Sequence, residues 1–96
     1  MKTNDPLEKV IEAKTVAFAK SKNILCYKFV SPNMRSVPDR VFFYQGKTLF
    51  IEFKRLGHKP TFAQFVEHAK LRAAGMRVEV VDCVEQGMKL VEDFLK

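Results

Sequence analysis

Two acidic residues and a lysine are the side chains of this sequence best suited to chemistry. Asp39 ends the segment Val-Pro-Asp at 37–39, and Glu52 and Lys54 lie within Ile-Glu-Phe-Lys at 51–54. We expect Asp39 at the start of a strand over 40–44. A second strand is expected over 48–53. Because side chains alternate along the stretch from Leu49 to Lys54, Glu52 and Lys54 share one face. A hairpin of these two strands brings the Asp39 carboxylate beside that of Glu52.

Neighbouring carboxylates predict a metal ion. They repel each other and raise each other's pKa unless a cation lies between them. Mg²⁺ or Mn²⁺ prefers oxygen ligands and keeps bound waters for chemistry. Such an ion can polarise a phosphate, while Lys54 would hold or deprotonate the nucleophile, which together indicates phosphodiester hydrolysis. The plainer interpretation is an exposed salt pair between Glu52 and Lys54, which would contribute little.

The spacing of apolar residues predicts one α/β domain over residues 1–96. Strands are expected over 24–30, 40–44, 48–53 and 77–81, with the 40–53 hairpin in the centre of the sheet. A first helix opens at Pro6, is capped by Asn4 or Asp5, and runs to about Lys20. A second follows the cap Thr61 and stops at Gly75, and a third spans 84–95. The order αβββαβα predicts a sandwich with helices on both faces of a mixed sheet.

The inward side of the second helix is predicted to be its apolar stripe. That stripe consists of Phe62, Phe65, Val66, Ala69 and Ala73. We therefore interpret Phe62 and Phe65 as core residues rather than as platforms for stacking bases, and His68 as a surface residue.

Composition points to a basic, cytoplasmic protein. A chain of 96 residues, 47% of them hydrophobic, suits one domain with a modest core. A net charge of +6 favours a polyanionic partner, with nucleic acid ahead of anionic membrane. Cys26 and Cys83 lie in apolar runs and are expected to be reduced core residues. The sequence shows neither a signal-peptide core nor an apolar run long enough to cross a bilayer, so we expect no membrane association.

The ordered motifs resemble those of a known nuclease superfamily. Ser-Val-Pro-Asp-Arg at 36–40 is followed by Phe-Ile-Glu-Phe-Lys-Arg at 50–55, by Gln64, and by Gly75 ahead of Val-Glu-Val-Val at 78–81. Residues 7–85 thereby resemble the PD-(D/E)xK superfamily and, within it, the small VRR-NUC proteins. Many members have glycine where this chain has Ser36, a departure that touches no ligand.

The resemblance implies a restriction-endonuclease-like fold and assigns roles to individual residues. Asp39, Glu52 and the main-chain carbonyl of Phe53 would ligate the metal, and Lys54 would be the catalytic lysine. Glu12 matches the position where archaeal Holliday-junction resolvases and their relatives keep a further acidic residue, and Glu8, one turn away, is an alternative.

Further residues are candidates for contact with the substrate. Gln64 would orient phosphate or water, although a polar residue on the solvent side of a helix is an equal interpretation. Related resolvases use a polar residue near Ser31 and Lys28 against the substrate backbone; for Lys28 an ordinary strand-end residue is the better interpretation. A basic rim could bind phosphates. Its candidate members are Arg35, Arg40, Lys54, Arg55, His58, Lys59, Lys70 and Arg72.

The leading hypothesis is an Mg²⁺-dependent endonuclease that leaves a 5′-phosphate. The resemblance alone suggests branched DNA, such as four-way Holliday junctions, as its substrate. Because junction resolution needs two symmetric cuts and the chain has one site, we expect a C₂ homodimer. The alternatives are cleavage of single-stranded, flap or duplex DNA, a non-catalytic nucleic-acid-binding module, and a basic scaffold whose motifs are coincidental. Clustered carboxylates, which repel phosphate, disfavour the binding module.

Overall fold

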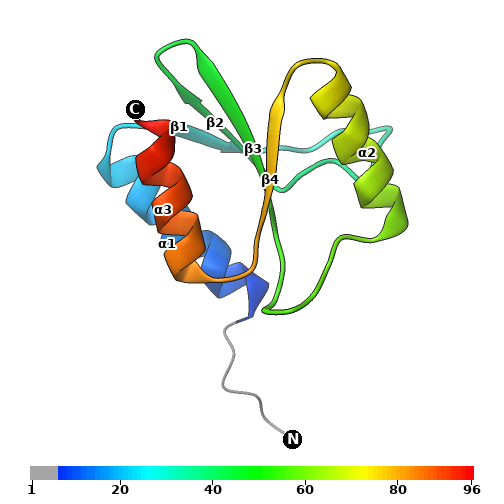
Figure 1. The fold of residues 1–96 in the computed structure, drawn as a ribbon, viewed down its shortest axis with the longest axis horizontal. Helices are drawn as coiled ribbons and strands as arrows, with labels where there is room; N and C mark the ends of the chain where they lie inside the picture. Colours follow the sequence, from blue (N-terminus) through cyan, green and yellow to red (C-terminus); the bar gives the residue numbers. More distant parts are fainter. Residues whose placement is uncertain (1–6) are drawn as a thin grey trace, which may run out of the picture.

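A computed structural model describes residues 7–96, and its elements follow the predicted order. Within these residues the helices are α1 (Glu8–Ser21), α2 (Phe62–Ala73) and α3 (Val84–Phe94). The strands are β1 (Leu25–Lys28), β2 (Arg40–Tyr44), β3 (Lys47–Phe53) and β4 (Arg77–Val81). Helices α1 and α3 lie together on one side of the sheet and α2 lies on the other (Figure 1). The predicted α/β sandwich is confirmed, whereas the predicted cap at Asn4 or Asp5 and the opening at Pro6 lie outside the described residues.

The mixed sheet places the β2–β3 hairpin at its centre, as predicted. The strand order is β1-β2-β3-β4, with antiparallel pairing along β1-β2-β3 and parallel pairing between β3 and β4. Gln45 and Gly46 join β2 to β3, with φ of 47° and 79°. Positive φ at both central residues matches the twist of a two-residue hairpin. Since Arg40 pairs with Ile51, the preceding residue Asp39 comes to lie next to the end of β3.

The main hydrophobic core lies between the sheet and the α1–α3 pair. Helix α1 ends at Ser21, one residue beyond its predicted end, and β1 is shorter than the predicted strand over 24–30. Cys26 is buried in the core as predicted, but Cys83 is only half-buried, at the N-cap of α3. No helix within residues 7–96 is long and apolar enough to cross a membrane. Fully buried members of the core include Ile11, Ala19, Phe42, Leu49, Ile51, Val81 and Val91.

The prediction for the inward side of α2 was wrong. Phe62 is 79% exposed and Phe65 59% exposed, whereas His68, expected at the surface, is 1% exposed. The side of α2 that meets the sheet carries Gln64, His68 and, at the far end, Leu71. Helical periodicity reveals an apolar stripe but not what the stripe faces. Here the sheet beneath α2 presents a carboxylate, that of Glu52, and polar residues of α2 meet it.

A close contact between α1 and α3 depends on Gly87. A Cβ added at this position would lie 2.2 Å from Oγ1 and 3.2 Å from Cβ of Thr15, a buried residue of α1. Thr15 Oγ1 has no hydrogen-bond partner among the described residues. The contact between Gly87 and Thr15 is therefore a van der Waals contact without a hydrogen bond from Thr15 Oγ1.

We expect Gly87→Ala to destabilise the protein by about 1–3 kcal/mol, because overpacking outweighs the gain in helix propensity. The double variant Gly87→Ala/Thr15→Ala should recover most of this loss, since it removes the obstructing side chain without breaking a hydrogen bond. Urea unfolding would measure both, with Lys89→Ala, an exposed change on α3, as the control. Equal stability of Gly87→Ala and the wild type would contradict the tight contact.

Candidate active site

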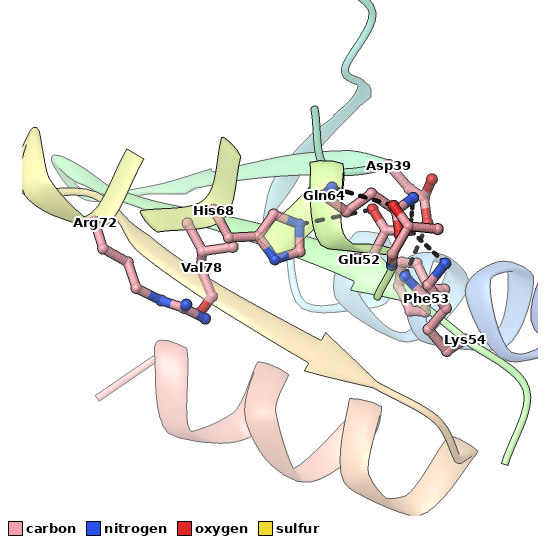
Figure 2. A network of polar contacts seen from close by, with 9 residues as sticks. Asp39, Glu52, Phe53, Lys54, Gln64, His68, Arg72 and Val78 are labelled. Carbon is pink, nitrogen blue, oxygen red and sulfur yellow. Dashed lines mark hydrogen bonds and ion pairs between the residues drawn. The ribbon is translucent and has the colours of Figure 1, made fainter. Parts of the chain in front are cut away.

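Asp39 is fixed through both its main chain and its side chain. It follows the fully buried Pro38, and its carbonyl accepts a hydrogen bond from the Phe29 N–H at 3.0 Å. Its Oδ2 accepts a second from the Phe53 N–H at 2.8 Å. The loop that precedes β2 is thereby held against the end of β3. The carboxylate lies beside Glu52, as the hairpin predicted (Figure 2).

Glu52 is a buried carboxylate surrounded by polar side chains. Only 2% of the residue is exposed, so the interpretation as an exposed salt pair is wrong. Oε2 accepts a hydrogen bond from Gln64 Nε2 at 3.1 Å and lies 3.5 Å from Lys54 Nζ. Oε1 lies 4.0 Å from His68 Nε2. A dashed line marks this contact in Figure 2. Within the described part of the chain, neither Oε1 nor His68 Nε2 has a hydrogen-bond partner.

The surroundings of the two carboxylates disfavour their charged forms. Burial, followed by the charge of Asp39, raises the pKa of Glu52 to about 7, with Lys54 acting in the opposite direction. Burial also raises the pKa of Asp39, opposed by the hydrogen bond from Phe53. The pKa of His68 is lowered by burial and then by the nearby Arg72 and Lys54, which favours the neutral imidazole. Without a metal ion, the surroundings therefore do not fully stabilise the negative charge that Asp39 and Glu52 carry when both are ionised.

Gln64 connects the start of α2 to this site. Its N–H donates to Thr61 Oγ1 at 3.2 Å, and its Oε1 accepts from the Thr61 N–H at 2.9 Å, which makes the predicted cap a capping box. The other end of the same amide donates to Glu52. The structure thus places Gln64 at the site, not on the solvent side, with its amide directed at a carboxylate.

Glu12 and Glu8 lie near the paired carboxylates without joining them in a cluster. Glu12 Oε2 accepts from Arg40 Nε at 2.6 Å, so the predicted phosphate-binding Arg40 and the predicted metal-binding Glu12 are partners of each other. Within residues 7–96, no three acidic, histidine or cysteine side chains are placed to hold a metal by themselves. Glu8 is exposed, and both glutamates raise the pKa of Asp39 through their charge.

Two surface hollows meet at Asp39. One, of about 460 Å³, is lined by Glu8, Glu12, Asp39, Phe53, Arg55 and His58, among others. The other, of about 300 Å³, is lined by residues of the 29–37 loop together with Asp39. Ser31 and Arg35 belong to this second hollow. Predicted substrate-binding residues thus lie on both sides of the carboxylate.

Other members of the predicted basic rim lie elsewhere. Lys59 lines a separate hollow that it shares with His58 and Asp82. Lys28, which is not a member of the predicted rim and is interpreted as an ordinary strand-end residue, is exposed at the end of β1. Lys70 pairs with Glu67 at 3.8 Å, and Arg72 donates to the carbonyl of Val78 at 2.8 Å. The basic residues that contact Glu52 or line a hollow together with Asp39 are therefore Lys54, Lys9, Arg55, His58 and Arg35, and Arg40 pairs with Glu12.

Comparisons with known proteins agree with this geometry. The chain matches no protein-family model. It is 46% identical over 76 residues to "Putative nuclease p44" of Acyrthosiphon pisum secondary endosymbiont phage 1, covering 78% of this chain and 82% of that protein. A solved structure described as a VRR_NUC domain superposes with a TM-score of 0.82 and 26% identity, covering 91% of this chain and 96% of the other. The chain belongs to the VRR-NUC nuclease family. The family predicted from the sequence motifs is thereby confirmed.

In this VRR-NUC chain the site residues fit a hard divalent cation. The oxygen ligands available are the carboxylates of Asp39 and Glu52. Mg²⁺ usually takes only one or two protein carboxylates and completes its coordination with waters and substrate phosphate. A pair of carboxylates is therefore sufficient. The buried Glu52 Oε1, without a partner in the described chain, shows that the carboxylate has unused capacity to accept.

His68 is the residue of this VRR-NUC site that sequence reasoning missed. It lies on the same side of α2 as Gln64, one helical turn further on. The spacing of four residues from a glutamine already assigned to the site was a usable signal, because residues i and i+4 are neighbours on a helix.

The pKa of Glu52 predicts a pH-dependent loss of stability in metal-free protein. Between pH 4.5 and about 7 the unfolded chain releases this proton while the folded chain retains it, so stability falls as pH rises through that window. The full loss is about 3 kcal/mol. We expect Glu52→Gln to be more stable than the wild type at pH 8 by about 1–3 kcal/mol, with no gain at pH 4.

Urea unfolding in EDTA across pH 4–8 would test this, with Glu92→Gln, an exposed change, as the control. A stability difference between Glu52→Gln and the wild type that does not vary with pH would contradict the assigned cause.

Proposed function

We propose that the chain is an Mg²⁺- or Mn²⁺-dependent DNA endonuclease that leaves a 5′-phosphate and prefers branched DNA such as four-way junctions. The observation that carries the catalytic part is the grouping of Glu52 and Lys54 beside Asp39, the residue that lines both surface hollows. The phage relative, named "Putative nuclease p44", supports the same activity.

Asp39 and Glu52, with the Phe53 carbonyl, are the residues proposed to hold the cation. When bound, the ion would polarise the scissile phosphate and make a bound water acidic. The Phe53 N–H fixes one oxygen of Asp39, and Gln64 fixes one oxygen of Glu52. The two carboxylates are thus oriented before any ligand arrives. Glu12, held by Arg40, adds negative charge to the wall of the larger hollow and is proposed as a support of the site.

Lys54 is proposed as the catalytic cation of the protein itself. Its side chain is 14% exposed, so the ammonium is largely shielded from water while remaining reachable. Attack on a phosphodiester builds negative charge on the phosphate oxygens, and a fixed ammonium in a partly dry site stabilises that charge. Its partner Glu52 keeps it beside the proposed metal site.

The two hollows give the DNA backbone a path across the site. Ser31 and Arg35 would contact one side of the scissile phosphate, and Arg55 and His58 the other. Such contacts position the backbone and carry little sequence information. The net charge of +6 supports attraction to a polyanion.

The preference for branched DNA rests on the resemblance to resolvases and needs two sites. We propose a C₂ homodimer that packs through the outward stripe of α2. The large residues Phe62 and Phe65 occupy the start of this stripe and the small Ala69 and Ala73 its end. A two-fold axis that sets two copies of α2 antiparallel places large residues of one copy against small residues of the other. The stripe is therefore complementary to itself.

Cleavage of unbranched DNA is the second candidate function. Open hollows on either side of Asp39 can accept a single strand or a duplex backbone as well as a junction arm. Cleavage assays that compare branched with unbranched DNA distinguish this function from junction cleavage.

We expect Lys54→Ala to reduce cleavage of an end-labelled four-way junction at least about 100-fold in Mg²⁺ or Mn²⁺. Lys89→Ala, an exposed change on α3, should cut as the wild type does. Paired symmetric nicks in the junction but not in a matched linear duplex would support the full proposal. Equal cutting of both substrates would discard the junction preference, and no cutting by the wild type in either metal would point to a binding module.

We expect Phe65→Glu to convert a dimer to a monomer, because it buries a charge in the proposed interface. Leu25→Glu, which alters a comparably exposed residue (52%) on edge strand β1, should leave the mass unchanged. Light scattering after gel filtration measures both. Dissociation by Leu25→Glu alone would move the interface to the sheet edge. Loss of DNA binding by Phe65→Glu at unchanged mass would show that Phe65 contacts the nucleic acid instead.

A further inference from the structure

A buried histidine faces the central carboxylate of the site. His68 Nε2 and Glu52 Oε1 are 4.0 Å apart, and each lacks a hydrogen-bond partner within residues 7–96. His68 is 1% exposed and Glu52 2% exposed, so bulk water does not satisfy either atom. Figure 2 shows the imidazole directed from α2 toward the carboxylate. Two unsatisfied polar atoms therefore share one buried location.

Such an arrangement destabilises the folded protein, so its presence requires an explanation. An unpaired buried donor or acceptor costs about 1–3 kcal/mol. An apolar residue at position 68 would avoid the cost on its own side, as Leu71 does further along the same side of α2. A movement of roughly 1 Å would bring the two atoms to the 2.9 Å of an ordinary N–H···O bond. The neutral imidazole has one N–H to give.

We propose that His68 is a positioning residue that donates its Nε2 hydrogen to Glu52 Oε1 and so fixes the carboxylate for metal binding. Gln64 and Lys54 contact the other oxygen, Oε2. With His68 added, both oxygens of Glu52 are oriented by donors, two of which come from α2 one turn apart. A carboxylate held at both oxygens loses less freedom on binding a cation. This inference rests on the proposed function, because it takes Glu52 as a metal ligand.

The arrangement of α2 supports this assignment over simple filling of space. Two of the residues that α2 turns toward the sheet, Gln64 and His68, are directed at Glu52. Meanwhile the aromatic residues of the same helix, Phe62 and Phe65, remain exposed. A helix selected only for core packing would be turned the other way.

The test is an isothermal calorimetric titration of Mn²⁺ into the protein in the absence of DNA. We expect His68→Leu and His68→Met to weaken Mn²⁺ binding about 10-fold or more, because loss of a group that orients a ligand typically costs 10–100-fold. His68→Gln, whose amide can donate to Oε1, should restore binding to within about 3-fold of the wild type. The two apolar variants differ in shape, so the comparison can be made with whichever folds.

Leu71→Ala is the matched control for packing. Leu71 lies on the same inward side of α2 and packs on the buried apolar residues Val41, Phe50 and Val78. It should lower the melting temperature in EDTA without changing the affinity for Mn²⁺. Wild-type affinity in a folded apolar variant of His68, or equal weakening in His68→Gln, would overturn the positioning role alone. Failure of the wild type to bind Mn²⁺ would overturn the proposed function and this inference with it.

Discussion

Burial of the Glu52 carboxylate between the sheet and α2 is the constraint on which the rest of the structure depends. A carboxylate removed from water is stable only when other groups hydrogen-bond to it or neutralise it. Lys54 meets this need from the same strand, and Gln64 meets it from the first turn of α2. The need is only partly met, because burial and Asp39 still raise the pKa of Glu52 to about 7. The protein's own groups thus do not fully neutralise the two carboxylates, and a bound cation would complete the neutralisation.

The same constraint determines how α2 is turned. Because polar side chains of α2 must face Glu52, its apolar stripe is directed outward, where Phe62 is 79% exposed. Exposed apolar surface of this kind is typical of interaction sites. One helix therefore connects the carboxylate chemistry to the surface on which assembly is proposed. The capping box strengthens the link, since the Gln64 amide both closes the start of the helix and contacts the carboxylate.

The hairpin and the helix pair fix the other half of the site. The two-residue turn at Gln45-Gly46 sets the register that brings Asp39 to the end of β3, and the Phe53 N–H then holds its side chain. On the opposite face, Gly87 allows α3 to pack closely on Thr15 of α1. These contacts make the sheet a rigid base. Arg35 and Arg55, by contrast, line the surface hollows beside Asp39.

The sequence by itself determined the order of the elements, the central hairpin and the pairing of Asp39 with Glu52. These follow from local periodicity, turn residues and strand register, which short segments encode. It did not determine that His68 is buried, that Phe62 and Phe65 are exposed, or that Arg40 pairs with Glu12. Those outcomes depend on which side of one element meets another distant in sequence. Only the tertiary structure decided them, because the sheet face that meets α2 includes a buried carboxylate, to which Gln64 and His68 are directed, beside the apolar residues that meet Leu71.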